Sequence, residues 1–186
     1  MNFIKKHLLF IFFFFGLIIR LSMIFFDYSW DVNNHMVWAK DFLMRGPQNF
    51  YETQSSNVFA TFTPNYPPLS IFLFVIMRLF SPLIHSIYWW LNINIPLVPS
   101  NLIFFLEKTV FLAGLMKVPA ILSDLGIAFL IFLFAKKIIP KNRKGQIITT
   151  GLILFNPAFI YNSSLWGQID SIPIFFVLLS VYFLLY

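Results

Sequence analysis

The sequence contains no cysteine and little charge. Its 186 residues include seven acids, and 11% of them are charged, against about 25% in an average soluble protein. The absence of cysteine excludes a disulfide framework, a thiol nucleophile and a cysteine-ligated metal. Hydrophobic residues make up 59% of the chain, with 26 phenylalanines. This composition predicts a membrane protein.

The net charge of +6 is not arranged as it is in a nucleic-acid-binding protein. The basic residues lie in short segments that flank apolar runs, where membrane topology places them. The first apolar run, residues 8–26, follows Lys5 and Lys6. It exceeds the ~7–15 residues of a signal-peptide core, and no small-x-small cleavage site follows it. We therefore interpret it as a retained transmembrane span.

Four apolar segments are candidates for membrane crossings of about 20 residues. They are residues 8–26, 109–135, 146–161 and 171–186. The basic loop 135–145 and the basic residues before the first span predict the cytoplasmic side. Loop 27–66, which holds four of the seven acids, is therefore expected outside. Because the last span is still apolar at Tyr186, we expect residues 1–186 to be the N-terminal part of a larger membrane domain.

A further apolar run, residues 69–91, is interrupted by Arg78 and Pro82 and ends in aromatic residues typical of a membrane interface. An odd number of crossings must join the outer loop to the basic loop, so either one or three would satisfy the topology. We expect an interfacial or re-entrant helical hairpin on the outer side, which leaves 109–135 as the single crossing. The alternative places three crossings between residues 67 and 135.

The predicted fold is all-α, a polytopic transmembrane helical bundle with amphipathic or interfacial helices in the first outer loop. Within residues 31–45 the apolar side chains recur at helical spacing, which predicts an amphipathic helix on the outer membrane surface. Asp31 stands at its start, where a carboxylate accepts hydrogen bonds from free backbone N–H groups. A helix cap and a general base that deprotonates a hydroxyl are both open for Asp31, and they are compatible.

Two further segments combine proline with polar residues. Pro67 and Pro68 precede an apolar run and predict a rigid, extended entry into a helix. In residues 155–173 a span is expected to end near Asn156, and a polar turn leads to the next helix. Asp170 is a candidate cap for that helix. Gln168 is instead a candidate for a site shared with the first outer loop, because both loops are expected on the same side.

Taken in order, these segments resemble those of the polytopic GT-C-class glycosyltransferases, especially the polyprenyl- or dolichyl-phosphate-sugar-dependent mannosyl- and glucosyltransferases. The resemblance covers nearly all of the chain. It rests on DYSWDVNNHMVWAKDF, a GP…FY turn, YPPL, KVPAILSDLGIAFLIFLFAKK and NPAFIYNSSLWGQIDSIP. It implies a hexosyltransferase that moves a sugar from a polyprenyl-phosphate donor to a glycan, lipid or protein acceptor on the extracytoplasmic face.

The resemblance also implies roles for particular residues. Asp31 matches the outer-loop aspartate that acts as general base in an inverting displacement, and the departing lipid phosphate needs positive charge. The candidate phosphate partners are Arg78, Lys108 and Lys117. For Lys117 the alternative is a pairing with Asp124, two helical turns away. The remaining candidate substrate-binding residues are Asp27, His35, Tyr66, Gln168 and Asp170.

The spacing of the acids in the first outer loop bears on whether the protein binds a metal. Asp27 and Asp31 are four residues apart and form no D-x-D pair, so we assign no metal site, although the two carboxylates could share a divalent ion. Arg20 lies inside the first span, either snorkelling or facing the bundle, and receives no role. A transporter or flippase of lipid-linked saccharides and a non-catalytic membrane subunit are the alternatives. The expected location is an integral, multi-pass one, in the plasma membrane of a prokaryote or the endoplasmic reticulum of a eukaryote.

Overall fold

The computed structural model describes the backbone of residues 2–60 and 62–186, and the side chains of residues 7–60 and 62–186. Helices make up 74% of the chain, and no strand occurs in the described residues. The predicted all-α class is therefore confirmed. The chain divides into two compact units. Unit 1 comprises Met1–Phe26 and Pro119–Tyr186, and unit 2 comprises Asp27–Val118.

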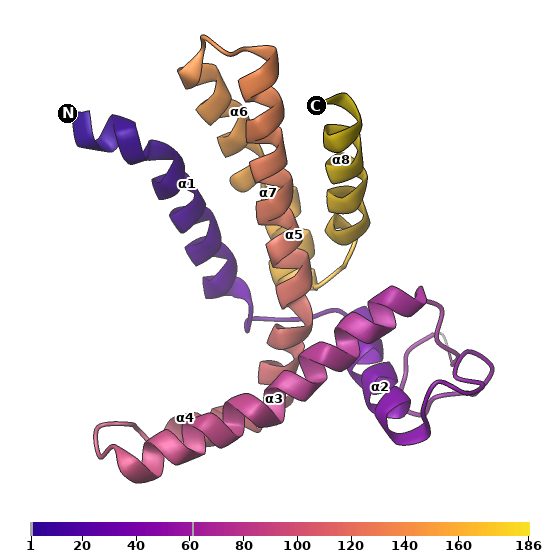
Figure 1. The fold of residues 1–186 in the computed structure, drawn as a ribbon. Coiled ribbons are helices and arrows are strands. Elements are labelled where there is room, and N and C mark those ends of the chain that lie inside the picture. Colours follow the sequence, from indigo (N-terminus) through magenta and orange to yellow (C-terminus); the bar gives the residue numbers. More distant parts are fainter. Residues whose placement is uncertain (1, 61) are drawn as a thin grey trace. The chain divides into compact units, whose positions relative to one another are not determined.

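Unit 1 contains helical segments in each of the four predicted spans, but with different boundaries (Figure 1). They are α1 (Asn2–Met23), the part of α5 (Thr109–Ile138) from Pro119 onward, α6 (Arg143–Leu154), α7 (Pro157–Ile160), the π-helix η1 (Tyr161–Trp166) and α8 (Ser171–Leu185). The predicted span 146–161 is interrupted, because Pro157 has no N–H to continue α6. The Asn156 side chain accepts from Ala158 N at 2.9 Å and restarts the helix as its cap.

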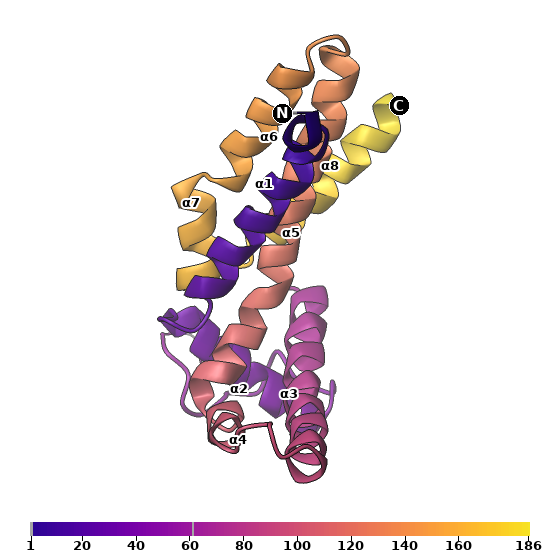
Figure 2. The same ribbon diagram turned by 90° about the vertical axis from the view of Figure 1, so that its left-hand side faces the viewer.

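Helices α1 and α6 approach closely through two glycines (Figure 2). A Cβ atom added to Gly16 would lie 3.1 Å from the Leu154 side chain, and one added to Gly151 would lie 2.8 Å from the Phe12 ring. Each glycine thus leaves room for a large side chain of the other helix, a mode of packing common between apolar helices.

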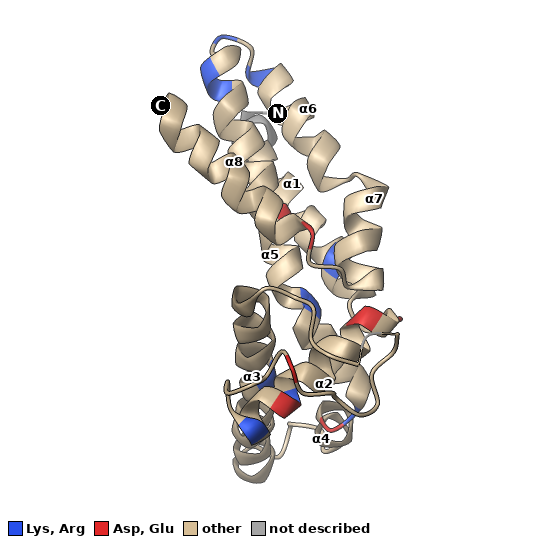
Figure 3. Cartoon of the chain, turned by 90° about the vertical axis from the view of Figure 1, so that its right-hand side faces the viewer, with Lys and Arg blue, Asp and Glu red and all other residues tan. Residues whose placement is uncertain are grey.

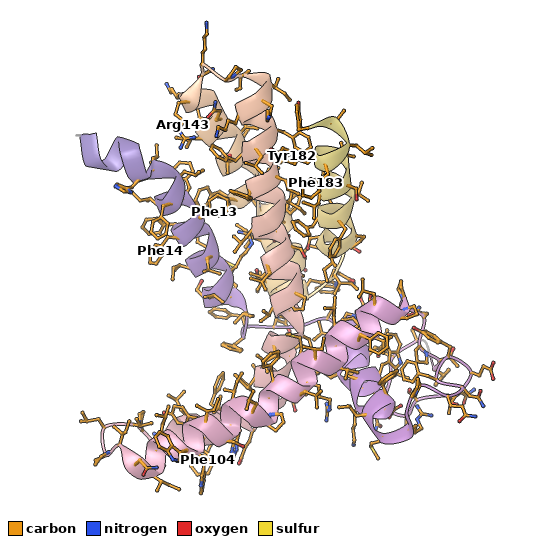
Figure 4. The ribbon with its side chains drawn as sticks, in the orientation of Figure 1. Phe13, Phe14, Phe104, Arg143, Tyr182 and Phe183 are labelled. Carbon is orange, nitrogen blue, oxygen red and sulfur yellow. The ribbon has the colours of Figure 1, made fainter. Side chains whose placement is uncertain are left out.

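Phenylalanines fill the space between the helices of unit 1 and also cover its outside. Figure 4 shows Phe13 pointing from α1 toward α5, where its ring lies 6.4 Å from that of Phe129. The neighbouring Phe14 points away and is 50% exposed. On the other side of α5, the Phe134 and Tyr182 rings meet edge to face at 5.4 Å. Aromatic rings exposed to this degree suit a lipid environment better than water.

Unit 2 is organised around the packing of two helices, α2 (Trp30–Arg45) and α3 (Pro68–Asn94). Its core is formed by buried residues of both helices, namely Val32, Met36, Trp38, Ala39, Ile71 and Phe74. The loop 46–67 connects the two helices, and α4 (Asn101–Leu106) and the start of α5 follow α3. The predicted amphipathic helix over 31–45 is thus present, and α3 begins at Pro68, directly behind the predicted rigid entry.

The hairpin predicted within 69–91 is wrong. Helix α3 is continuous over 27 residues and contains Pro82 in its interior. One proline removes a single backbone N–H, and α3 continues through Ser81 and Pro82 without a break. The chain reverses later, at residues 95–100, where Tyr88 Oη donates to Pro99 O at 3.0 Å and Asn92 Nδ2 donates to Val98 O at 2.8 Å. The helical hairpin is therefore formed by α3 and α4.

Two described helices, α3 and α5, are long and apolar enough to cross a membrane. The most apolar part of α5 is 50% buried, whereas that of α3 is only 17% buried. Lysines and arginines gather at the turn between α5 and α6 (Figure 3). These features support association with a membrane.

Candidate functional site

The first element of the candidate site is the segment from Asp27 to Asp31, which leads into the first turn of α2 and which we call the acidic stretch. Ser29 caps α2, its hydroxyl accepting from Val32 N at 3.4 Å. Asp31 is therefore not the cap, because Ser29 already occupies that position with extended backbone. Asp31 lies instead in the first turn, partly exposed, where the helix dipole favours a negative charge. That Asp31 acts as a general base remains a prediction.

Lys117 reaches the same stretch from α5. It is fully buried, and its ammonium group donates a hydrogen bond to the backbone carbonyl of Asp27. Asp124, the alternative partner of Lys117, forms an ion pair with Arg20, whose Nε lies 3.0 Å from its Oδ2. Of the three predicted phosphate partners, Lys117 is the one that contacts the acidic stretch.

His35 and Tyr66 lie together, but in a buried aromatic cluster. The His35 ring is stacked on Phe74 at 4.0 Å and meets the edge of Tyr66 at 4.9 Å. No described residue forms a hydrogen bond with either ring nitrogen. Burial lowers the pKa of His35 to about 3, so the ring is neutral at physiological pH. A substrate does not reach His35 in this structure, because its side chain is 0% exposed.

The other two predicted phosphate partners, Arg78 and Lys108, lie in one cleft of unit 2. We call it the basic cleft, and its volume is about 500 Å³. It is lined by Asn33, Met36, Val37 and Lys40 of α2, by Arg78, Ser81, Pro82 and His85 of α3, and by Leu106, Glu107, Lys108, Thr109 and Leu112 around the α4–α5 turn. Lys40 was not among the predicted site residues. Its position off the apolar face of α2 was the sequence signal that could have included it.

The basic cleft and Asp31 lie on different sides of α2. Asp31 precedes Lys40 by nine residues, which is two and a half turns, so the two side chains leave the helix in nearly opposite directions. Nine residues also separate them by about 13 Å along the helix axis. Arg78 and Lys108 are thus not gathered around the proposed base.

The predicted residues Gln168 and Asp170 belong to unit 1. Asp170 stands at the cap position of α8 but forms no capping hydrogen bond with its side chain. Asn162 Nδ2 donates to its Oδ2 at 3.4 Å. Asp170 and Asn162 line a pocket of about 400 Å³ together with Asp124. That this loop shares a site with Asp31 remains a prediction.

Arg20 faces the bundle, and its ion pair with Asp124 is buried. Arg20 Nε lies 3.0 Å from Asp124 Oδ2, with the two side chains 0% and 1% exposed. Arg20 Nη1 also donates to Leu154 O at 2.8 Å, and Ser163 Oγ donates to Asp124 Oδ2 at 2.7 Å. These contacts join α1, α5, α6 and η1. The 104 positions between the paired residues leave no local signal by which the sequence could have revealed the pairing.

The described residues contain no group of three or more His, Asp or Glu side chains placed to hold a metal ion. A divalent ion shared by Asp27 and Asp31 would therefore need ligands from its substrate or from water. No protein-family model, curated protein or solved structure matches the chain.

Proposed function

We propose that the chain is part of a multi-pass membrane glycosyltransferase that uses a polyprenyl-phosphate-linked sugar. The observation that carries the proposal is the meeting of the acidic stretch with Lys117 in unit 2. Asp31 supplies a partly exposed carboxylate in the first turn of α2, and four residues earlier Asp27 lies beside a buried ammonium group. The transfer of a sugar from a phosphate needs both a base and a positive charge.

The proposed reaction is a single inverting displacement. Asp31 accepts the proton of an acceptor hydroxyl as that oxygen forms a bond to the anomeric carbon. The bond between this carbon and the phosphate oxygen breaks, and the polyprenyl phosphate leaves with its electron pair. Lys117 stabilises the charge that develops on the phosphate electrostatically, from its buried position and without direct contact. Because the mechanism uses side chains of one unit only, it does not depend on Gln168 or Asp170.

Other features agree with this proposal. Phenylalanine-rich helices such as α1 and α8 expose many large apolar side chains, as expected of a polytopic bundle in lipid. The ordered set of segments resembles the GT-C class over nearly the whole chain. A transporter of lipid-linked saccharides is the second candidate, and the buried Arg20–Asp124 pair favours it, because intramembrane charges often mark transport pathways.

The substitution Asp31→Asn tests the proposal. It keeps the shape of the side chain and leaves the cap at Ser29 in place. We expect transfer from a radiolabelled polyprenyl-phosphate sugar, measured in membranes that contain the natural full-length protein, to fall about 10²–10⁴-fold, because base catalysis is removed. The amount of inserted protein should not change.

Matched controls are available in the same unit. Asp41 is paired with Arg45 at 2.6 Å on the surface, and Glu52 is exposed. Asp41→Asn and Glu52→Gln should therefore have milder effects on transfer. Transfer at the parental rate by a correctly inserted Asp31→Asn protein would show that Asp31 is not the base. Saccharide uptake without any transfer would favour the transporter.

A further inference from the structure

The basic cleft carries positive charge that the protein itself does not neutralise. Its cations are Lys40, Arg78 and Lys108. Neither lysine has a hydrogen-bonding or ionic partner in the described part of the chain, and the hydrogen bond of Arg78 goes to the backbone carbonyl of Met36, 3.2 Å from Nη1. The acid in the lining is Glu107, whose Oε1 lies 3.2 Å from His85 Nε2.

This arrangement suits an oxyanion. Like charges that line one cleft repel one another, and a bound anion removes that repulsion. A phosphate group accepts hydrogen bonds from a guanidinium and from two ammonium groups at the same time, each bond strengthened by charge. The cleft volume of about 500 Å³ exceeds what a bare phosphate fills, which leaves room for the organic part of a headgroup.

The opposite side of α3 indicates where such a phosphate would come from. Arg78, Ser81, Pro82 and His85 follow one another at helical spacing and face the cleft. Half a turn away, α3 presents large exposed apolar side chains, namely Ile76, Phe80, Leu83, Ile87 and Trp90. An uncovered apolar side of a helix whose other side lines a cleft with three cations is typical of the membrane interface, where lipid phosphates lie.

We propose that the basic cleft binds the phosphate group of an anionic bilayer lipid. The cleft lies on the side of α2 opposite to Asp31, and its cation Lys40 is about 13 Å from Asp31 along the helix axis, so the cleft is distinct from the proposed transfer site. The lipid is held at the interface by Lys40, Arg78 and Lys108, with its acyl chains beside α3. This inference requires membrane association but does not depend on sugar transfer.

Retention of lipids by the purified natural protein tests the inference. Phosphatidylglycerol and phosphatidylcholine are titrated separately into detergent-solubilised protein, and bound lipid is counted by native mass spectrometry. We expect phosphatidylglycerol to be retained in preference to phosphatidylcholine. In the double variant Lys40→Gln/Lys108→Gln its affinity should fall about 25-fold, because each basic side chain near an anionic headgroup contributes a factor of about five. Both lysines are exposed, so the fold should not change.

The control removes the same amount of charge elsewhere. Lys141→Gln/Lys144→Gln changes two exposed lysines of the α5–α6 turn, which do not line the cleft, and should leave retention unchanged. Equal losses in the two double variants would overturn the proposal, because general attraction would then explain binding. Inorganic phosphate is titrated as a third probe. If it saturated the cleft while phosphatidylglycerol and phosphatidylcholine were retained equally, the site would be one for free phosphate and the lipid proposal would be wrong.

Discussion

At the scale of single residues, the Arg20–Asp124 ion pair stands out in unit 1 because it buries two charges. Both side chains are almost completely buried, and neither Arg20 Nη2 nor Asp124 Oδ1 has a hydrogen-bond partner among the described residues. Burying two charges is costly, and their attraction offsets this cost only while both are present. The contribution of each residue to stability therefore depends on the presence of the other far more than on the packing of its own side chain.

Substitution of the pair should reveal this dependence. We expect Arg20→Met or Asp124→Leu alone to destabilise the protein by about 3–5 kcal/mol, because each leaves an uncompensated buried charge. The double variant Arg20→Met/Asp124→Leu should recover most of that loss. Unfolding in mixed detergent, followed by circular dichroism, provides the comparison. Simple additivity of the two single effects would contradict a coupled pair.

At the scale of helices, local sequence signals were sufficient to predict most of the helices. They failed where contacts between residues distant in the chain determine the structure. The apolar runs and the periodicity over 31–45 predicted α1, α2, α5 and α8. The hairpin within 69–91 was wrong because Pro82 marks a break in water-soluble helices, whereas α3 continues through it. For the site, the sequence indicated Arg78 and Lys108 but not their shared cleft, because it is formed by helices distant in the chain.

The orientation of α3 at the membrane can be measured directly. Because the chain has no cysteine, the single variants Ser70→Cys and Asn94→Cys each report one end of the helix. We expect an impermeant maleimide to label both from outside, since one side of α3 is apolar and uncovered and the other lines the basic cleft, as in a helix that lies in the interface. Labelling from opposite sides would mean that α3 crosses the bilayer, as in the alternative with three crossings.

At the scale of the whole molecule, the distribution of charge along the chain sets the expected topology. The α5–α6 region carries a cluster of basic residues, namely Lys136, Lys137, Lys141, Arg143 and Lys144, while four of the seven acids lie within 27–66. Short basic loops stay in the cytoplasm during insertion. Unit 2 should therefore hold its acidic stretch and its cleft on the outer side.

Two exposed positions, Ser56 and Lys141, are suitable reporters of this topology. In the outer loop Ser56 is a better site for a cysteine than its neighbour Ser55, because Ser55 is buried and its hydroxyl accepts from Arg45 Nη2 at 3.3 Å. We expect Ser56→Cys to react with an impermeant reagent on intact cells, and Lys141→Cys to react only after permeabilisation. The reverse pattern would invert the topology and place the proposed transfer site in the cytoplasm.

The two glycines between α1 and α6 have a consequence for assembly. Gly16 accommodates Leu154, and Gly151 accommodates Phe12, so large and small residues alternate in complementary order on the two helices. Sliding α1 by one turn, about 5.4 Å, in one direction would set glycine against glycine and open a void. Sliding it in the other direction would drive Phe12 into Leu154. The two helices therefore fit in a single register, and this register sets Arg20 beside the Leu154 carbonyl of α6, which accepts from Arg20 Nη1 at 2.8 Å.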